Sequence, residues 1–277
     1  MNDSNQTDVT KRVAIVVAHS NRDYLTDAEQ ISLKHLLHYL DRYDRYIIIP
    51  ESLDFSLPDF GTVRFDDKYF GSVDAHRSLL FSTDYYQAFS SYEFILSYHL
   101  DALVFSDELM YWCDRDYDFI GPPWIIHKDA PYFGNSAYEG KVGNGGFSLK
   151  KVSSFLKVMN STEFAIDPDE YWRKFHARQR LPRRILNWPK KLRMKSHRYN
   201  NVRWEMDRWN RNEDLFIADR ATHYYPGFKI APLDVALRFG FESVPRYCYD
   251  VTGHTLPFGC HAWERYDREF WEQFLLK

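Results

Sequence analysis

Asp101 is the first residue whose type and position could support chemistry. It lies in YHLDALVFSDEL, where the apolar run FILSYHLDALVF (94–105) predicts a central strand that runs out into a turn at this residue. Ligands of open α/β sheets bind beyond the carboxyl ends of strands. A carboxylate there can hold a divalent cation against a diphosphate and neutralise a leaving group, although the same Asp could simply cap the turn.

Two further groups follow along the chain. GNGGFSLKK contains Gly145 and Gly146, and glycines let backbone approach a ligand closely, although turns before strands often carry them too. NEDLF (212–216) places Glu213 and Asp214 at the start of a predicted helix. Either carboxylate could act as the general base that takes the proton of an acceptor hydroxyl; alternatively, the pair only complements the helix dipole.

The fourth group is GHTLPFGCHAW (253–263), which contains His254, His261 and Trp263. A loop histidine can ligate a metal ion or bind a phosphate. The indole of Trp263 can pack against a substrate or only against the core. This group is therefore a candidate for completing a site that the earlier groups begin.

The elements that must position these residues alternate between strands and helices. VAIVVAH (13–19) and YIIIP (46–50) predict buried strands. Thr26 and Glu29 have capping-box spacing ahead of the helical pattern ISLKHLLHYL. Such a strand–helix–strand opening is typical of a parallel nucleotide-binding sheet, and it makes His19, at the end of the first strand, a candidate donor-binding residue.

The later segments continue the same alternation and predict one α/β domain over residues 1–277, with a mixed, mainly parallel sheet flanked by helices and a basic helical insertion at 160–211. The further elements expected are a short strand at TVRF, a helix over 74–90, a strand over 118–124, a strand ending at Lys150, a helix over 151–159, a helix over Glu213–Ala221 and short strands near 228–238.

The succession LDALVFSDELMYWC, YDFIGPPW, VGNGGFSLKKV, NEDLF and LPFGCHAW resembles a bacterial family of domains of unknown function that is regarded as glycosyltransferase-like, with the GT-A nucleotide-sugar fold. The resemblance covers roughly residues 10–160 and 205–265 and leaves out the basic stretch. It implies transfer of a sugar from a nucleotide-sugar donor to an acceptor hydroxyl, with inversion favoured, in surface polysaccharide or glycolipid assembly. The same fold could instead serve a non-catalytic nucleotide- or glycan-binding module.

The resemblance also implies roles for single residues. Asp101 stands where GT-A enzymes place the Asp-x-Asp motif that binds the donor diphosphate through Mn²⁺ or Mg²⁺, but Leu103 departs from that motif, and the neighbouring acids are Asp107 and Glu108. His261 resembles a late histidine that completes the metal or phosphate site. Glu213 and Asp214 resemble the acidic pair that supplies the catalytic base. The other residues implied to contact the donor are Gly145, Gly146, Phe147 and Trp263.

Charge is segregated along the chain, which bears on its partners. Residues 171–204 contain twelve Lys or Arg and no Asp or Glu, whereas the whole chain has a net charge of −3. Interleaved residues such as Trp188 and Leu186 suit an anionic membrane surface that presents a glycan or lipid-linked acceptor. The alternatives are a solvated cationic face and a nucleic-acid groove, and the acidic remainder of the chain counts against nucleic acid.

Cysteine usage and hydropathy bear on location. Cys113, Cys248 and Cys260 are odd in number and widely spaced, which fits a reducing compartment rather than a disulfide framework. The start MNDSNQTDVTKR lacks the apolar segment of a secretory signal. No stretch approaches the roughly 18 apolar residues that span a bilayer. We therefore expect a cytoplasmic protein that can attach peripherally to the inner face of the membrane.

Overall fold

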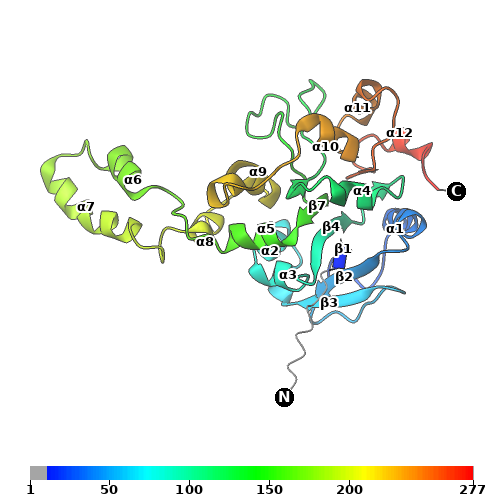
Figure 1. Ribbon diagram of the computed structural model, residues 1–277, viewed down its shortest axis with the longest axis horizontal. Helices are drawn as coiled ribbons and strands as arrows, with labels where there is room; N and C mark the ends of the chain where they lie inside the picture. The colour runs from blue at the N-terminus through cyan, green and yellow to red at the C-terminus, as the bar shows by residue number, and fades with distance from the viewer. Residues whose placement is uncertain (1–10, 277) are drawn as a thin grey trace, which may run out of the picture.

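A six-stranded sheet in the order β3-β2-β1-β4-β7-β6 forms the centre of the protein (Figure 1). The computed structural model describes residues 11–276, so most of the stretch tested for a secretory signal lies outside the described residues. The first four strands pair in parallel, whereas β7 runs antiparallel to β4 and to β6. The mixed, mainly parallel sheet predicted from the sequence is therefore confirmed. Its strands are β1 (Lys11–Ala18), β2 (Asp44–Pro50), β3 (Gly61–Phe65), β4 (Tyr92–His99), β6 (Phe119–Ile120) and β7 (Phe147–Lys151).

Helices cover both faces of this sheet because side chains alternate along each strand. On one face, Ile15 and Leu96 pack with α1, α4 and α10, and on the other, Ala14 and Ile95 pack with α2, α3, α5 and α9. The covering helices are α1 (Asp27–Tyr39), α2 (Val73–Leu80), α3 (Thr83–Gln87), α4 (Leu109–Asp114), α5 (Val152–Met159), α9 (Glu213–Tyr224) and α10 (Leu233–Phe239). As predicted, Thr26 and Glu29 form a capping box at the start of α1.

A smaller, three-stranded sheet, β5-β9-β8, lies beside the first. Its buried Phe241 and Cys260 pack with Trp263 and Trp271, which belong to the C-terminal segment. The elements of this part are β5 (Leu103–Val104), β8 (Gly240–Phe241), α11 (Pro245–Val251), β9 (Gly259–Cys260) and α12 (Arg268–Glu272). The three cysteines are buried and free. None of the helices within residues 11–276 has the length and apolar character needed to span a bilayer.

Several predicted element boundaries are wrong, each for a local reason. The helix expected over 74–90 is two helices, because the side chain of Ser82 caps a new start at α3. The strand expected over 118–124 is only Phe119–Ile120, since the prolines that follow cannot donate to a sheet. The strands expected near 228–238 are largely replaced by helix α10, whose Ala236 and Phe239 lie three apart and are both buried.

Two helices project from the body as an arm, α6 (Pro168–Phe175) and α7 (Leu181–Met194) (Figure 1). The arm returns to the body through α8 (Val202–Met206). Asn200, which is fully buried, closes the base of the arm: its Nδ2 donates to the carbonyls of Ile166 and Met194, and its Oδ1 accepts from the amide of Ile166. The side chain of Asn200 thereby joins the segment that enters the arm to the segment that leaves it.

We predict that Asn200→Ala lowers the free energy of unfolding by about 2–4 kcal/mol, because it removes three hydrogen bonds and leaves buried backbone groups without partners. Urea unfolding measures the change. The matched control is Asn160→Ala, an exposed position with one side-chain hydrogen bond, where the change stays below about 1 kcal/mol. Equal midpoints for the two variants would contradict a closing role for Asn200.

Candidate active site

A cavity of about 690 Å³ opens where the carboxyl ends of β1 and β4 meet the start of β7. Ala18 at the end of β1 pairs with His99 at the end of β4, and the amide of His99 donates to the carbonyl of Gly146 at 2.7 Å. Because β7 is antiparallel, its first residues lie at the same edge as the carboxyl ends of the parallel strands. The predicted site residues that line this cavity are His19, Asp101, Gly145, Gly146, Glu213, Asp214 and His261.

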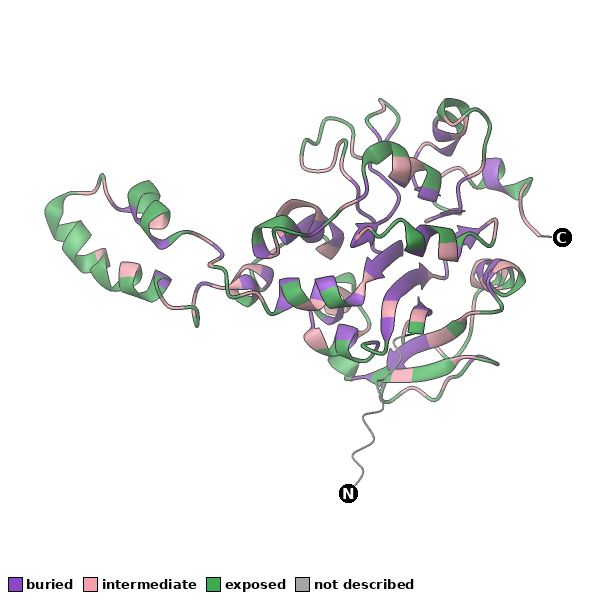
Figure 2. Cartoon of the chain, viewed as in Figure 1, coloured by how far each residue is buried: buried purple, intermediate pink, exposed green. Residues whose placement is uncertain are grey.

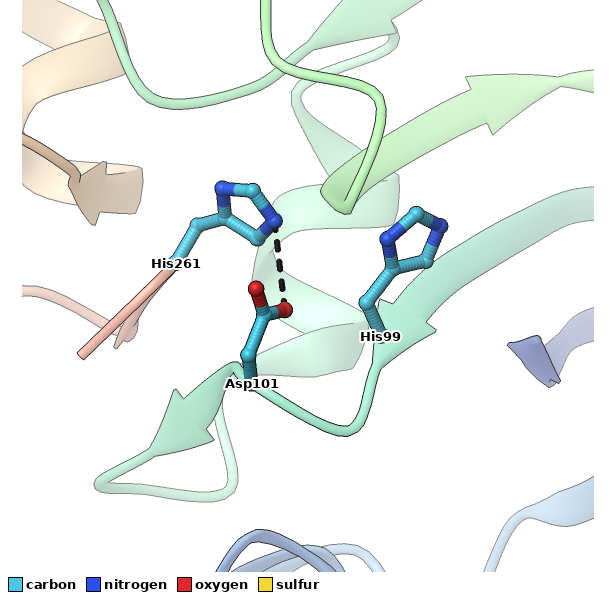
Figure 3. Close-up of side chains that lie close together, drawn as sticks. All are labelled: His99, Asp101 and His261. Carbon is cyan, nitrogen blue, oxygen red and sulfur yellow. Dashed lines mark ion pairs between the residues drawn. The ribbon is translucent and has the colours of Figure 1, made fainter. Parts of the chain in front are cut away.

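Three of the lining side chains form a cluster that could hold a metal ion. His99, Asp101 and His261 each offer one ligand atom, and these atoms all lie within 4.8 Å of one another (Figure 3). His99 ends β4, Asp101 lies in the turn that follows, and His261 follows β9. The sequence interpretation missed His99, which stands two residues before Asp101 in His-Leu-Asp, whereas the motif was sought two residues after it. The spacing of that tripeptide was the available signal.

The backbone holds the two segments of this cluster together. The amide of Trp263 donates to the carbonyl of Asp101 at 3.1 Å, and the amide of His261 donates to the carbonyl of Phe241 at 2.9 Å. Ala262, between them, has φ of 52°, a left-handed conformation that costs energy for a residue with a Cβ. The loop therefore keeps His261 directed at Asp101 through a backbone geometry that is unfavourable in isolation.

At Gly145 and Gly146, neighbouring side chains occupy the space that a Cβ would take. A Cβ on Gly145 would overlap the carboxylate of Glu213. One on Gly146 would overlap the imidazole of His261 and come within 2.9 Å of Nδ1 of His99. The groups that approach these glycines closely are the protein's own side chains, and the expected approach of a ligand stays a prediction.

His261 is held as an imidazolium between two carboxylates. Its Nε2 lies 3.3 Å from Oδ1 of Asp101, and its Nδ1 lies 3.5 Å from Oε1 of Glu242. Burial lowers the pKa of His261, but the two carboxylates outweigh burial and raise it to about 10. Burial would likewise raise the pKa of Asp101, yet the charge of His261 holds that pKa well below its usual range. Nδ2 of Asn144, a hydrogen-bond donor, lies 2.9 Å from the same Nδ1, and this contact opposes the effect of Glu242 because it favours an unprotonated Nδ1.

His99, in contrast to His261, is uncharged. Burial, together with the neighbouring His76 and His261, lowers its pKa to about 3, so this imidazole is neutral and has a free lone pair. A neutral imidazole, a carboxylate and an imidazolium whose proton a cation could displace make a usable ligand set. Two imidazoles with one carboxylate suit a transition-metal ion better than Mg²⁺.

The two acids at the start of α9 differ in burial, since Glu213 is half-buried and Asp214 is buried. Asp214 is buried, with Oδ2 accepting from the amide of Gly145 at 3.0 Å and Oδ1 accepting from the amide of Leu215 at 2.7 Å. Burial, together with the negative charges of Glu213 and Glu242, raises the pKa of Asp214 to about 7. Buried Lys150, whose pKa burial lowers, interacts electrostatically with Glu213 and Asp214. It donates a hydrogen bond to Oγ of Ser97 at 3.0 Å.

Two predicted donor contacts lie elsewhere. Phe147 is fully buried, and its ring fills the space left by the absent Cβ of Gly259. Trp263 is fully buried in the C-terminal core, with Arg268 over its ring. Neither side chain lines the cavity, so direct contact with a donor is corrected to a packing role. Aromatic type alone did not distinguish a platform from a core residue.

Other candidates from the sequence also separate by position. His19 lines the cavity, stacks on Phe55 and has Nε2 2.7 Å from the carbonyl of Arg22. His254 is exposed and lies 3.4 Å from Asp250, outside the cavity. Asp107 accepts from Tyr43 and therefore does not substitute for the second acid of an Asp-x-Asp motif. The cavity residues that sequence reasoning missed include His76, Arg77, His99, Trp124, Tyr132, Asn144, Glu242 and Arg265.

A family model described as "Protein of unknown function (DUF5672)" matches residues 59–261. No curated protein matches this sequence.

Similar solved structures include the apo-form glycosyltransferase GlyE of Streptococcus pneumoniae TIGR4, with 14% identity over 97% of this chain and 61% of that chain and a TM-score of 0.43. This chain therefore spans about three fifths of that structure's length. A glycosyltransferase involved in glycosylation of the major capsid of PBCV-1 has 10% identity over 95% and 98% of the two chains and a TM-score of 0.46. An active-site variant of LgtC has 12% identity over 94% of each and a TM-score of 0.46.

We predict that Asp101→Asn lowers the pKa of His261 from about 10, because the substitution removes a negative charge that stabilises the imidazolium. Glu242→Gln should lower it as well, for the same reason. Nuclear magnetic resonance titration of the histidine ring in chelator-treated protein measures both shifts. Asp250→Asn, beside the distant His254, is the control and leaves His261 unchanged. A wild-type His261 that loses its proton below neutral pH would contradict this electrostatic description.

Proposed function

This chain belongs to the family described as "Protein of unknown function (DUF5672)", and we propose that it is a glycosyltransferase that moves a sugar from a nucleotide-sugar donor to an acceptor hydroxyl. The observation that carries the proposal is the sharing of one cavity by a candidate cation site and a carboxylate pair. Transfer from a diphosphate donor needs both groups at once, one at the leaving group and one at the incoming hydroxyl.

The proposed reaction is a single displacement at the anomeric carbon of the donor sugar. The acceptor oxygen forms a bond to the anomeric carbon of the donor sugar, while the bond from that carbon to the diphosphate oxygen breaks. The electron pair leaves with the nucleoside diphosphate, and the hydroxyl proton passes to a carboxylate of the enzyme. Attack opposite the leaving group inverts the anomeric centre, in accordance with the inversion favoured from the sequence.

We assign the diphosphate to the side of the cavity that His99, Asp101 and His261 line. These residues would hold a Mn²⁺ ion, which when bound supplies positive charge to the departing phosphate. The need for such charge follows from the lining, because acidic residues there outnumber Arg77 and Arg265. The nucleoside would extend toward His19 and the start of α1, which line the same cavity.

Asp214 is our candidate for the general base. A base works best when its pKa is near the working pH, and the pKa of Asp214 is raised to about 7. One hydrogen bond to each of its oxygens leaves lone pairs available for the acceptor proton. Glu213, the adjacent cavity residue, supports this role by raising the pKa of Asp214, while buried Lys150 balances part of the negative charge.

The proposal extends to partners and location. The acceptor is a glycan or a lipid-linked glycan, as in surface polysaccharide assembly, and residues 171–204 bring the enzyme to an anionic membrane surface at its cytoplasmic face. The alternative of a non-catalytic binding module makes a different prediction, since a transferase hydrolyses its donor slowly when no acceptor is present, whereas a binding module does not.

The first test is calorimetry with nucleoside diphosphates, with and without Mn²⁺. We expect binding that Mn²⁺ strengthens, because the cation links the diphosphate to the cluster. His99→Ala and Asp101→Asn should each abolish the effect of Mn²⁺ while the protein stays folded. His254→Ala, an exposed histidine outside the cavity, serves as control. Folded wild-type protein that binds none of the diphosphates would rule out this function.

The second test separates the two acids. Asp214→Asn should lower turnover by roughly 10²–10⁴-fold with little change in donor affinity, as expected for the loss of a general base. In the wild type, kcat/KM should rise with pH through about 7, as Asp214 loses its proton. Glu213→Gln removes a neighbouring negative charge and should move this rise to lower pH. The opposite pattern, with turnover lost in Glu213→Gln and kept in Asp214→Asn, would transfer the role of base to Glu213.

A further inference from the structure

Helix α7 carries an exposed apolar stripe. Leu181, Ile185, Trp188 and Leu192 are separated by four, three and four residues, which places their Cβ atoms on one face of a helix. Their side chains are 53–66% exposed, although apolar faces of soluble helices are normally buried. Figure 2 shows that the arm is exposed along most of its length.

Cations without partners accompany this stripe. Within the described part of the chain, Arg183, Arg184 and Lys190 have no ion-pair partner, whereas Lys191 lies 2.9 Å from Asp169. Like charges this close repel one another unless an anionic partner is present. Apolar side chains and unpaired cations on one projecting helix are the combination that binds at the interface of an anionic bilayer.

The arm is held in a defined direction by the helix that begins with the acidic pair. Arg220 of α9 donates to the carbonyl of Ala165 at 3.0 Å and pairs with Glu205 of α8 at 2.9 Å. Nε2 of His223, also in α9, lies 2.8 Å from the carbonyl oxygen of Phe164. Because both ends of the arm contact α9, a surface bound by the arm would have a fixed orientation relative to the cavity.

We propose that α7 is a membrane-insertion helix: its apolar stripe enters the boundary between headgroups and acyl chains of an anionic bilayer, and Arg183, Arg184 and Lys190 contact lipid phosphates. This inference deepens the membrane partner in the proposed function but does not depend on catalysis. A nucleic acid fits less well, because three of the four stripe residues are aliphatic and cannot stack on bases. A second copy of the arm would bring like charges together.

Sedimentation with vesicles of equal parts phosphatidylcholine and phosphatidylglycerol tests the charges. The triple change Arg183→Glu, Arg184→Glu and Lys190→Glu should weaken binding about 100-fold or more. The control changes three exposed cations of the body that have no ion pair within the described residues, Arg115→Glu, Lys128→Glu and Arg238→Glu, and should retain more affinity at the same net charge. Equal losses for the two triples would overturn a specific role for the arm.

A second pair of variants tests the apolar contribution. Ile185→Ser with Leu192→Ser should weaken binding to the same vesicles about tenfold or more, since less apolar surface leaves water. Ile126→Ser with Val251→Ser, also exposed but on the body, should have no effect. Donor hydrolysis should be unchanged in the stripe variant, so that failure of this inference is distinguished from failure of the proposed function. Unchanged vesicle affinity of the stripe variant would overturn insertion.

Lipids brominated near the headgroup measure insertion directly, because they quench a tryptophan that enters the bilayer. Tryptophan emission of the wild type should fall on binding, and Trp188→Phe should remove most of that decrease while binding persists. Binding without quenching of Trp188 would mean adsorption alone and would overturn the inference. Preferential binding of a single-stranded RNA oligonucleotide over these vesicles would also overturn it, in favour of nucleic acid.

Discussion

The absence of side chains at Gly145 and Gly146 lets three distant parts of the chain meet at the start of β7. The carboxylate of Glu213 and the imidazoles of His261 and His99 occupy the space where Cβ atoms would otherwise lie. The amide of Gly145 also donates to Asp214, which ties the glycine turn to α9. The glycine turn therefore lets these side chains approach one another, and a methyl group at either position would force the carboxylate of Glu213 or the imidazoles of His261 and His99 to shift.

Charge balance is the second constraint on the cavity. Carboxylates that share a cavity repel one another, and those that are buried are costly to ionise unless cations or hydrogen bonds compensate them. The imidazolium of His261 compensates Asp101 and Glu242, whereas Asp214 meets like charge and has a raised pKa. The proposed cation ligands and the proposed base therefore have different electrostatic environments within one cavity.

Helix α9 connects this chemistry to the arm. Its first residues are the acidic pair, and Arg220 and His223 in its second half contact the segments that enter and leave the arm. Asn200 closes the arm at the same place. A single helix thereby relates the orientation of a projecting amphipathic surface to the orientation of the cavity, as a transferase that meets its acceptor at a membrane would require.

The sequence by itself determined the local elements and the order of the candidate residues. Strand β1, the capping box of α1 and the position of Asp101 at a strand end all follow from hydrophobic periodicity and cap chemistry, which act over a few neighbouring residues. Errors arose where that signal was weak, as at Ser82, which divides one predicted helix into α2 and α3.

Only the tertiary structure decided which candidates act together. It joined His261 to the His99–Asp101 turn, placed Phe147 and Trp263 in the core, and gave Asp214 and Glu213 different environments. These outcomes depend on contacts between residues far apart in the sequence, such as Asp101 with His261 and Gly145 with Asp214. Burial and charge at such contacts are set by packing of the whole chain, so residue type and spacing could nominate the site residues but not assign their roles.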